Sequence, residues 1–238
     1  NLLTQQKEAL ELYKKGVMQQ LFPSTGSGGK PQLRFKDENG NDFPDWEEKR
    51  LGKIGKTFNG LTGKSKEDFG KGKPYIQYKQ IFDSSRINVA KCDYVKILPN
   101  EGQWKAQFGD VFFTTSSETP NEVGMSSVLL DQVEEMYLNS FCFGFRPNSF
   151  DVLLPEFAVF LFRNSHSRKK IMKLAQGSTR YNMSKQELMK IKFPIPCKAE
   201  QQKIAAFLSS IDVKIERVSQ QIEQSKTWKK GLIQKMFV

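Results

Sequence analysis

Apolar side chains recur at steps of three and four residues along the C-terminal part of the chain, the spacing of one face of an α-helix. The positions are Ile204, Leu208, Ile211, Ile215, Val218, Ile222, Leu232 and Met236. Only Ser225 and Lys229 interrupt the pattern. Because this spacing is typical of a coiled-coil seam, we expect one long helix over residues 199–238. With a rise of ~1.5 Å per residue it extends about 60 Å, beyond a compact domain.

Residues 1–22 carry a second helical pattern. Its apolar positions are Leu3, Leu10, Val17 and Leu21. Residues 6–22 also align with residues 221–237, and both copies contain a Lys-Lys-Gly triplet. A repeat that occurs once in full and once as a fragment predicts that the chain is one unit of a longer tandem. Residues 1–22 are then the tail of the helix that ends the preceding unit. The apolar stripe of this tail needs a partner, so we expect it to pack antiparallel against the C-terminal helix.

Residues 23–32 are rich in Pro, Gly and Ser and predict a linker before a central domain over residues 33–198. Short strand-like runs separated by turn signals predict a β-rich core. They cover residues 74–78, 94–98, 109–115 and 127–130. Helical patterns cover residues 155–174 and 184–191, the second with Ser184 as N-cap and Glu187 in the capping-box position. The predicted fold class is α+β, a mixed globular domain plus long helices that form an antiparallel coiled coil.

Charge changes this picture by suggesting a partner. The net charge is +11 with 37 Lys and Arg against 26 Asp and Glu, which favours a polyanionic ligand. Residues 49–105 carry 13 basic and 5 acidic side chains, and residues 163–198 carry 10 and 1. Residues 106–162 between them carry 1 basic and 8 acidic side chains. The basic segments predict a phosphate-facing surface if they converge, and ordinary solvated surface if they do not.

Two segments, residues 73–80 and 177–182, place polar and aromatic side chains among basic ones. Arg, Gln and Asn can bind base edges, whereas Lys, Ser and Thr hold phosphates. A hydroxyl cluster at residues 114–119 also suits a phosphate contact. The candidate DNA-binding residues are Lys73, Tyr75, Gln77, Lys79, Gln80, Thr115, Ser116, Ser178, Thr179, Arg180, Tyr181 and Asn182. The alternative to DNA contact is a strand with an exposed polar face for residues 73–80, and an ordinary loop for residues 114–119.

Enzyme motifs are weak in this sequence. His166 is the single histidine, and Cys92, Cys142 and Cys197 are too widely spaced for a disulfide framework or a zinc motif. Residues 60–65 resemble the end of a P-loop but separate the glycines by two residues where four are needed. No apolar run of about 18 residues and no signal-peptide profile occurs. We expect a cytoplasmic protein without a membrane contact, a metal, a cofactor or a catalytic site of its own.

Four segments together resemble the specificity subunits of type I restriction-modification systems. Residues 46–60 resemble the segment that opens a target-recognition domain. The most specific match is a proline-containing segment at the end of the domain, which is followed by Glu-Gln-Gln-Lys-Ile and a long helix. The further matching segments are residues 109–120, 177–184 and 193–205. The resemblance covers nearly the whole chain, with one recognition domain, one complete helix and the tail of another. It is therefore similar to half of such a subunit, or to a natural half-subunit.

The resemblance implies a function in DNA recognition without catalysis. Such subunits read a split double-stranded DNA target, one half per recognition domain, and their helices act as an antiparallel spacer. Modification subunits methylate adenine with S-adenosylmethionine, and a restriction subunit joins through the complex. The repeat also predicts a homodimer in which one chain's C-terminal helix end replaces the N-terminal helix of another. The competing functions are a nucleic-acid binder or coiled-coil adaptor without sequence preference, and an enzyme with an unrecognised site.

Overall fold

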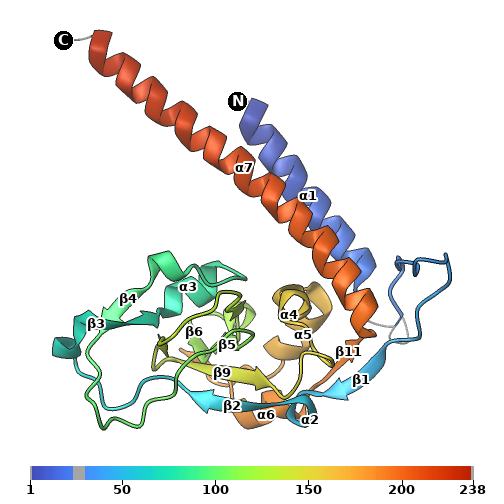
Figure 1. Ribbon diagram of the computed structural model, residues 1–238, viewed down its shortest axis with the longest axis horizontal. Coiled ribbons are helices and arrows are strands. Elements are labelled where there is room, and N and C mark those ends of the chain that lie inside the picture. The colour runs from blue at the N-terminus through green and yellow to red at the C-terminus, as the bar shows by residue number, and fades with distance from the viewer. Residues whose placement is uncertain (1, 24–29, 237–238) are drawn as a thin grey trace.

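The computed structural model describes residues 2–23 and 30–236, which form a pair of long helices and a mixed globular unit (Figure 1). Helices α1 (Leu2–Leu21) and α7 (Lys198–Met236) lie side by side in opposite directions and project from the globular unit. The predicted α+β fold class with an antiparallel pair of long helices is confirmed.

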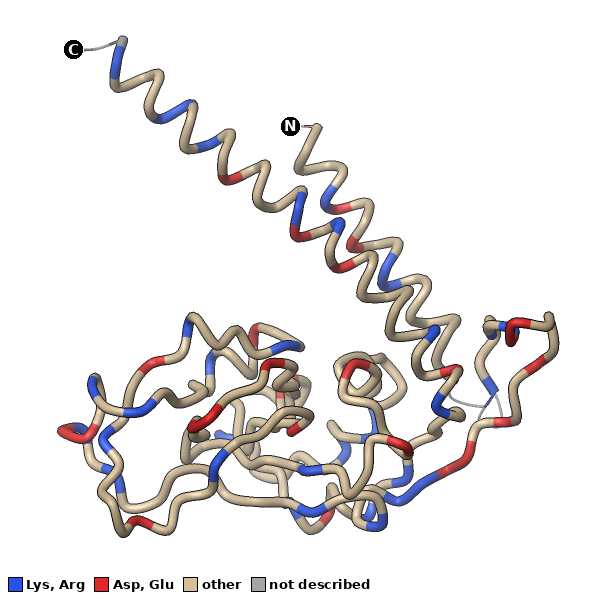
Figure 2. The backbone as a smooth tube through the Cα atoms, in the orientation of Figure 1, with Lys and Arg blue, Asp and Glu red and all other residues tan. Residues whose placement is uncertain are grey.

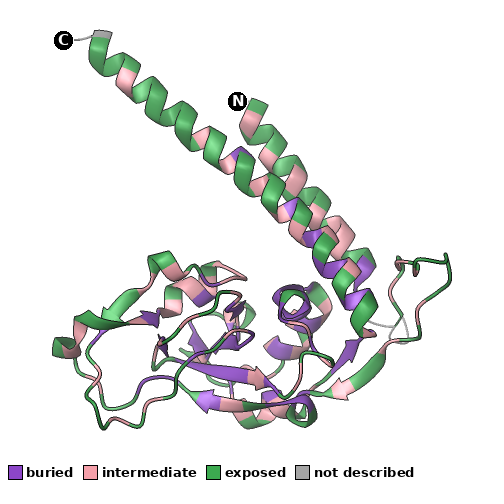
Figure 3. Ribbon diagram, viewed as in Figure 1, coloured by how far each residue is buried: buried purple, intermediate pink, exposed green. Residues whose placement is uncertain are grey.

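The predicted apolar seam of α7 is buried only where α1 covers it (Figure 3). Its buried members are Ile204, Leu208, Ile211 and Val218, whereas Ile215 and Ile222 are part-buried. Leu21 at the end of α1 is fully buried, and the Lys14 ammonium lies 2.5 Å from an Asp212 carboxylate oxygen across the two helices. Beyond this contact region Leu232 is 44% exposed and Trp228 is 69% exposed. The proximal seam is therefore a core, and the distal seam faces solvent.

The globular unit contains short strands with helices between them. In chain order the elements are β1 (Glu47–Arg50), α2 (Leu51–Ile54), β2 (Gly55–Asn59), η1 (Lys66–Asp68), β3 (Phe69–Ile76), α3 (Tyr78–Asp83), η2 (Val89–Lys91), β4 (Asp93–Val95), β5 (Val111–Thr114), β6 (Ser116–Ser117), η3 (Pro120–Glu122), β7 (Ser126–Val128), β8 (Tyr137–Leu138), β9 (Cys142–Pro147), α4 (Pro155–Leu161), α5 (Ser165–Met172), β10 (Tyr181–Asn182), α6 (Lys185–Lys190) and β11 (Lys192–Ile195). The η elements are single 3₁₀ turns.

The largest sheet is antiparallel and has the strand order β2-β9-β5-β7. A second sheet has the order β4-β3-β8, in which β3 pairs antiparallel with β4 and parallel with β8. Two further antiparallel pairs, β1-β11 and β10-β6, join segments far apart in the sequence. The β1-β11 pair sets the entry and exit of the globular unit side by side.

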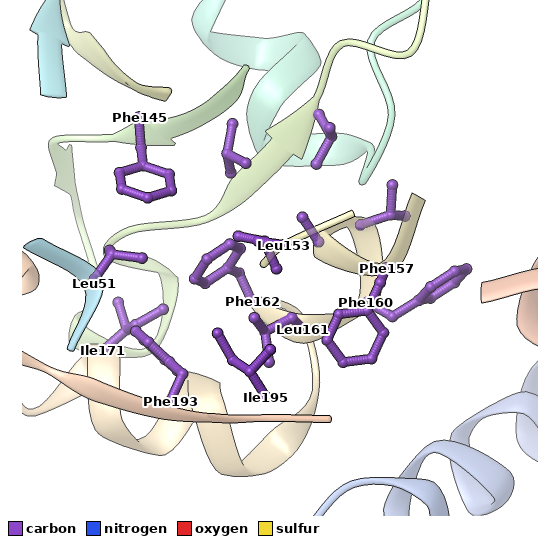
Figure 4. Close-up of a cluster of buried hydrophobic side chains, with 14 of the residues drawn as sticks. Leu51, Phe145, Leu153, Phe157, Phe160, Leu161, Phe162, Ile171, Phe193 and Ile195 are labelled. Carbon is purple, nitrogen blue, oxygen red and sulfur yellow. The ribbon is translucent and has the colours of Figure 1, made fainter. Parts of the chain in front are cut away.

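Strand β5 is buried on both faces, which explains its continuous apolar sequence. Val111 and Phe113 point into the main core, where the Phe113 ring meets the Phe162 ring edge to face at 5.2 Å. Figure 4 shows Phe162 in this core together with Phe193 and Leu161. Phe112 points to the opposite face and packs in a second core with Ile81 of α3. The sheet therefore separates α4 and α5 from α3.

The start of α7 is fixed to the segment that enters the globular unit. Glu200, in the first turn of α7, is fully buried. Its carboxylate accepts hydrogen bonds from Arg34 Nε at 3.0 Å and Arg34 Nη2 at 2.7 Å, and from the Trp46 indole at 3.1 Å. This network orients the helix pair relative to the globular unit.

The single helix predicted over residues 155–174 is two helices, α4 and α5. Asn164 between them has an extended backbone, and its side chain caps α5 by accepting from the Ser167 amide. Both helices keep the same apolar spacing, so periodicity alone does not reveal the break. The short helix was predicted correctly as α6, with Ser184 accepting from the Glu187 amide.

The strand predicted over residues 74–78 is also different. β3 begins earlier, at Phe69, and ends at Ile76, and α3 begins at Tyr78. The predicted strand over residues 94–98 is reduced to β4, which ends at Val95. β4 has three residues and pairs with β3 around a register shift. β3 has eight residues and also pairs with β8.

Some predictions concern parts of the sequence outside the described residues. Residues 24–29 of the predicted linker, Phe237 of the predicted repeat and the side chain of Met236 are among them. Within residues 2–23 and 30–236, no helix combines the length and the apolar character needed to cross a bilayer.

Candidate nucleic-acid interface

The three segments predicted to contact DNA meet in the structure. Residues 177–182 join residues 114–119 through the β10-β6 pair, in which Asn182 lies opposite Ser116. The end of residues 73–80 reaches the same place, because the Tyr78 hydroxyl donates a 2.6 Å hydrogen bond to the main-chain oxygen of Ser116, whereas Lys73 lies in a separate hollow beside Glu135. Segments about 100 residues apart in the chain therefore form one local surface.

A hollow of about 370 Å³ opens between these segments. Its lining includes Tyr78, Phe82 and Asp83 from α3, Ser117 and Glu118 after β5, and Arg180. The rings of Tyr78 and Phe82 are stacked with centroids 6.1 Å apart. Guanidinium groups bind guanine edges and carboxylates accept from cytosine amino groups, so this lining suits base edges better than phosphate alone.

The loop that carries Arg180 has a defined shape. Gln176 and Asn182 close it with two main-chain hydrogen bonds of 3.0 and 2.8 Å. Gly177 has φ +127°, and a Cβ atom there would lie 2.2 Å from the Arg180 carbonyl oxygen, so the loop requires glycine. The side chains of residues 178–180 are exposed at its tip. Ser178, Thr179 and Arg180 are thus displayed toward solvent, as is Asn182.

On α3 the predicted residues differ in how available they are. Lys79 is exposed, although its ammonium lies 3.0 Å from Asp83. The two glutamines bind within the protein: Gln80 Nε2 donates to Gln77 Oε1 at 3.3 Å, and Gln80 Oε1 accepts from the Asn88 amide at 2.7 Å. Gln77 and Gln80 therefore support this region, and DNA would have to compete for their amides.

Two predicted residues are buried. Tyr75 packs with Val95 and Tyr137 in a small core, and burial raises the pKa of its hydroxyl. Ser116 is also buried, and its main-chain oxygen is taken by Tyr78. The prediction that Tyr75 offers its side chain to DNA is corrected, because alternation along a strand does not tell which face is covered. Ser116 is mostly buried but lines the hollow, so its contact with DNA stays a prediction.

Three further candidate DNA-binding residues either bind another residue of the protein or are partly buried. The Lys73 ammonium lies 2.6 Å from Glu135, and this contact raises the pKa of Lys73. Thr115 donates its hydroxyl to the Phe141 carbonyl at 2.6 Å. Tyr181 is part-buried against the main core. These residues lie at the surface, but each already has a role inside the protein.

The two basic segments do not gather at the hollow. In Figure 2 the basic positions are spread along the whole globular unit. Arg163 and Arg168, counted in the second basic segment, are part-buried and donate to main-chain carbonyls. Asp83 and Glu118 also line the hollow, so its charge is mixed.

The chain also matches known proteins beyond this surface. Residues 44–225 match the family model of the type I restriction modification DNA specificity domain. The chain belongs to this family. The family is a non-catalytic DNA-recognition family, which agrees with the segments that suggested it.

A curated relative of this specificity domain is the MjaX type I restriction enzyme specificity subunit of Methanocaldococcus jannaschii. It is 29% identical over 208 residues, which is 85% of this chain and 48% of the relative. The chain spans about half the length of the relatives it matches.

Solved structures share the fold of this specificity domain. The HsdS subunit of Thermoanaerobacter tengcongensis superposes with a TM-score of 0.57 at 19% identity, covering 92% of this chain and 47% of that one. A chain from a structure on complex assembly and conformational transition of the type I system gives 0.61 at 18% identity, covering 97% and 51%. The Mycoplasma S subunit from M. genitalium gives 0.57 at 15% identity, covering 83% and 46%.

The candidate DNA-binding residues omitted several side chains at this surface of the specificity domain, including Tyr78, Asp83, Ser117 and Glu122 of the hollow's lining. Phe82 and Glu118 line the hollow, and Phe141 is 61% exposed at the turn that Thr115 binds. The spacing of four residues from Tyr78 to Phe82 was a usable signal, since it puts both rings on one helix face. Nothing in the sequence placed Phe141 beside Thr115, because that contact joins distant segments.

Groups suited to metal binding or nucleophilic chemistry are not assembled in the described part of this specificity domain. No cluster of three His, Cys, Asp or Glu side chains with metal-binding geometry occurs among residues 2–23 and 30–236. Burial raises the pKa of the Cys142 thiol, which disfavours its reactive thiolate, and lowers the pKa of His166.

Proposed function

We propose that this chain reads one half of a bipartite double-stranded DNA target through the hollow beside α3. The observation that carries the proposal is the meeting of three segments around Arg180. No hydrogen bond or ion pair within the described ranges holds the Arg180 side chain, so its guanidinium is available to a ligand. Family membership supports a role in DNA specificity, and the hollow supplies the side-chain types that base edges require.

Contacts are expected to divide by chemistry. Arg180 suits bidentate binding to a guanine edge, and Asn182 suits an adenine edge. Ser178, Thr179 and Lys79 suit phosphate oxygens, which set position without reading sequence. Their placement on one closed loop and one adjoining helix would allow both kinds of contact along a single stretch of duplex.

The long helices support an assembly role. We infer that the helix pair docks modification subunits, which supply S-adenosylmethionine and methylate adenine, and that a restriction subunit joins through that complex in the cytoplasm. The chain itself would need no cofactor. Adenine must leave the duplex for methylation, and the pocket that receives it would belong to the modification subunit.

The exposed distal seam of α7 supports a homodimer. Trp228, Leu232 and Ile233 are 69%, 44% and 45% exposed, and residues 221–237 resemble residues 6–22, which form most of α1, the helix packed on the proximal seam. A second chain's α7 could therefore exchange with α1. Light scattering across a hundredfold concentration range would show a rise in mass, and a constant monomer mass would contradict the dimer.

The direct test compares Arg180→Ala with Arg217→Ala, a matched control on α7 that removes an equal charge from an exposed site. Binding is measured by fluorescence anisotropy with duplexes selected by the wild-type chain, with and without a modification subunit. Arg180→Ala should cost about 1–3 kcal/mol at one base-pair position and relax preference there. Equal affinity and equal preference in all three proteins would refute the role of Arg180. Binding without any preference would favour a non-specific adaptor.

A further inference from the structure

Two arginines at the α4–α5 junction point into the protein and bind main-chain oxygens. Arg163 Nε donates to the Ser126 oxygen at 2.7 Å, and Arg163 Nη2 donates to Ile81, Phe82 and Ser84 oxygens at 2.7, 3.1 and 2.8 Å. Arg168 donates to the main-chain oxygens of Asn121, Val123 and Gly124 at 2.9, 2.6 and 2.6 Å. Neither guanidinium forms an ion pair within residues 2–23 and 30–236.

Apart from the Ser126 oxygen in β7, those oxygens belong to the end of α3 and to residues 121–124, here called the η3 loop. Arg163 holds the C-terminal end of α3, which supplies Phe82 and Asp83 to the hollow. Arg168 holds the loop after η3, the element that contributes Glu122. The two guanidinium groups therefore bind two different segments that contribute side chains to the predicted reading site.

The two arginines share one rigid support. Asn164 lies between them, donates from Nδ2 to the Leu161 oxygen at 2.6 Å and caps α5 through the Ser167 amide at 2.9 Å. This fixes the turn on which Arg163 and Arg168 are mounted. Movement of α3 relative to the η3 loop would break hydrogen bonds at one or both guanidinium groups.

Only arginine can make these contacts. A guanidinium presents five donors in a fixed planar arrangement, whereas a lysine ammonium is a point charge on a flexible stem. Burial lowers the pKa of Arg163 and of Arg168 to about 10, yet both groups remain charged near neutral pH. Each charge is therefore held away from water to bind neutral carbonyls, a costly arrangement that ordinary surface arginines do not adopt.

The η3 loop needs this support because its backbone is constrained. Gly124 has φ +64°, and a Cβ atom there would lie 2.6 Å from Ile171 Cγ2. The loop is thus pressed against α5 at the residue whose oxygen Arg168 binds. Its path therefore depends on Gly124 and on its contacts with α5.

We propose that Arg163 and Arg168 are positioning residues for DNA reading, which fix the separation of α3 and the η3 loop without touching DNA. This inference rests on the function proposed above. Precise placement matters because base discrimination depends on hydrogen-bond geometry, whereas phosphate attraction tolerates displacement. Loss of either arginine should therefore reduce discrimination more than overall charge-driven binding.

The test uses the full chain with Arg163→Lys and Arg168→Lys, which keep the charge. Leu208→Ala, a destabilising change on α7, is the control for a general loss of stability. Each protein is measured on a selected duplex and on the same duplex with one base pair changed, at several salt concentrations. We expect at least a tenfold loss of discrimination in both lysine variants, with the salt slope unchanged because phosphate contacts remain. Leu208→Ala should keep wild-type discrimination below its melting temperature.

Amide hydrogen exchange of residues 78–84 and 121–124 gives a readout that does not depend on DNA. Exchange there should accelerate in both lysine variants by more than in Leu208→Ala, which reports the acceleration due to a general loss of stability. Discrimination within twofold of wild type, or exchange at the wild-type rate, would overturn the inference. If the wild-type chain itself fails to discriminate duplexes, the proposed function fails, and the exchange data still decide whether the arginines hold the two elements.

Discussion

Replacement of Glu200 by Ala should strongly destabilise the chain, because Glu200 joins α7 to the entering segment. Its fully buried carboxylate binds the Arg34 guanidinium through two hydrogen bonds and also accepts from Trp46. The hydrogen bond to Glu200 is the main reason that the pKa of Arg34 is raised. Without the carboxylate, Arg34 keeps a charge that is only 17% exposed and has lost its closest partner.

The magnitude follows from this geometry. Removing one member of a buried ion pair costs about 3–5 kcal/mol, so we expect about 3 kcal/mol for Glu200→Ala, given the remaining exposure of Arg34. Glu200→Gln retains an acceptor and should cost about 1–2 kcal/mol. Replacing both partners, as Arg34→Met with Glu200→Met, removes the charge as well and should recover most of the loss.

Urea unfolding followed by tryptophan fluorescence measures these differences, since Trp46 lies in the network itself. Asp151→Ala is the matched control. Asp151 forms an ion pair with Lys198, which lies in the first turn of α7 like Glu200, but the Asp151 side chain is 79% exposed. That change should cost less than about 1 kcal/mol. A loss below about 1 kcal/mol for Glu200→Ala, or no recovery in the double variant, would refute the argument.

Three further predictions test other parts of the structure. Hydrogen bonds from two lysines and a tyrosine lower the pKa of Glu135 to about 2, so its contribution to stability is complete above its ordinary pKa and is lost as the pH falls toward 2. Glu135→Gln should therefore reduce the loss of unfolding free energy that urea titrations measure between pH 6 and pH 2, and an unchanged pH dependence would contradict this prediction. Leu208→Ala should cost about 2–5 kcal/mol, whereas Leu232→Ala on the exposed seam should cost less than about 1 kcal/mol in the same denaturation assay; equal losses would argue against the burial described for α7. Gly124→Ala should cost about 2 kcal/mol from its positive φ and its contact with α5, and a neutral thermal melt would show that this loop relaxes freely.

The long helices were predictable because their signal is repetitive and local. The apolar seam of α7 runs over many turns, so a single irregular position such as Lys229 does not hide it. The α6 cap at Ser184 was predictable for the same reason, since the capping box lies within four residues. The α4–α5 break was not, because Asn164 interrupts the backbone without interrupting the apolar spacing.

The surface was predictable only in outline. The sequence indicated which segments carry suitable side chains, and their meeting through β6 and β10 depends on a pairing of distant residues. It did not indicate which side of β3 is covered, so Tyr75 was misplaced. Net charge also could not separate Arg180, which is exposed, from Arg163 and Arg168, which bind carbonyls. The direction in which each of these side chains points depends on tertiary packing, which the sequence pattern does not show.

Selection from a randomised DNA pool tests the central claim most directly. The purified chain, with and without a cognate modification subunit, is incubated with random duplexes at near-physiological salt, and the bound duplexes are sequenced. The account predicts enrichment of a short motif, single for one recognition domain or duplicated across a fixed gap for two acting together. An unenriched pool in the presence of the modification subunit would contradict DNA reading by this chain.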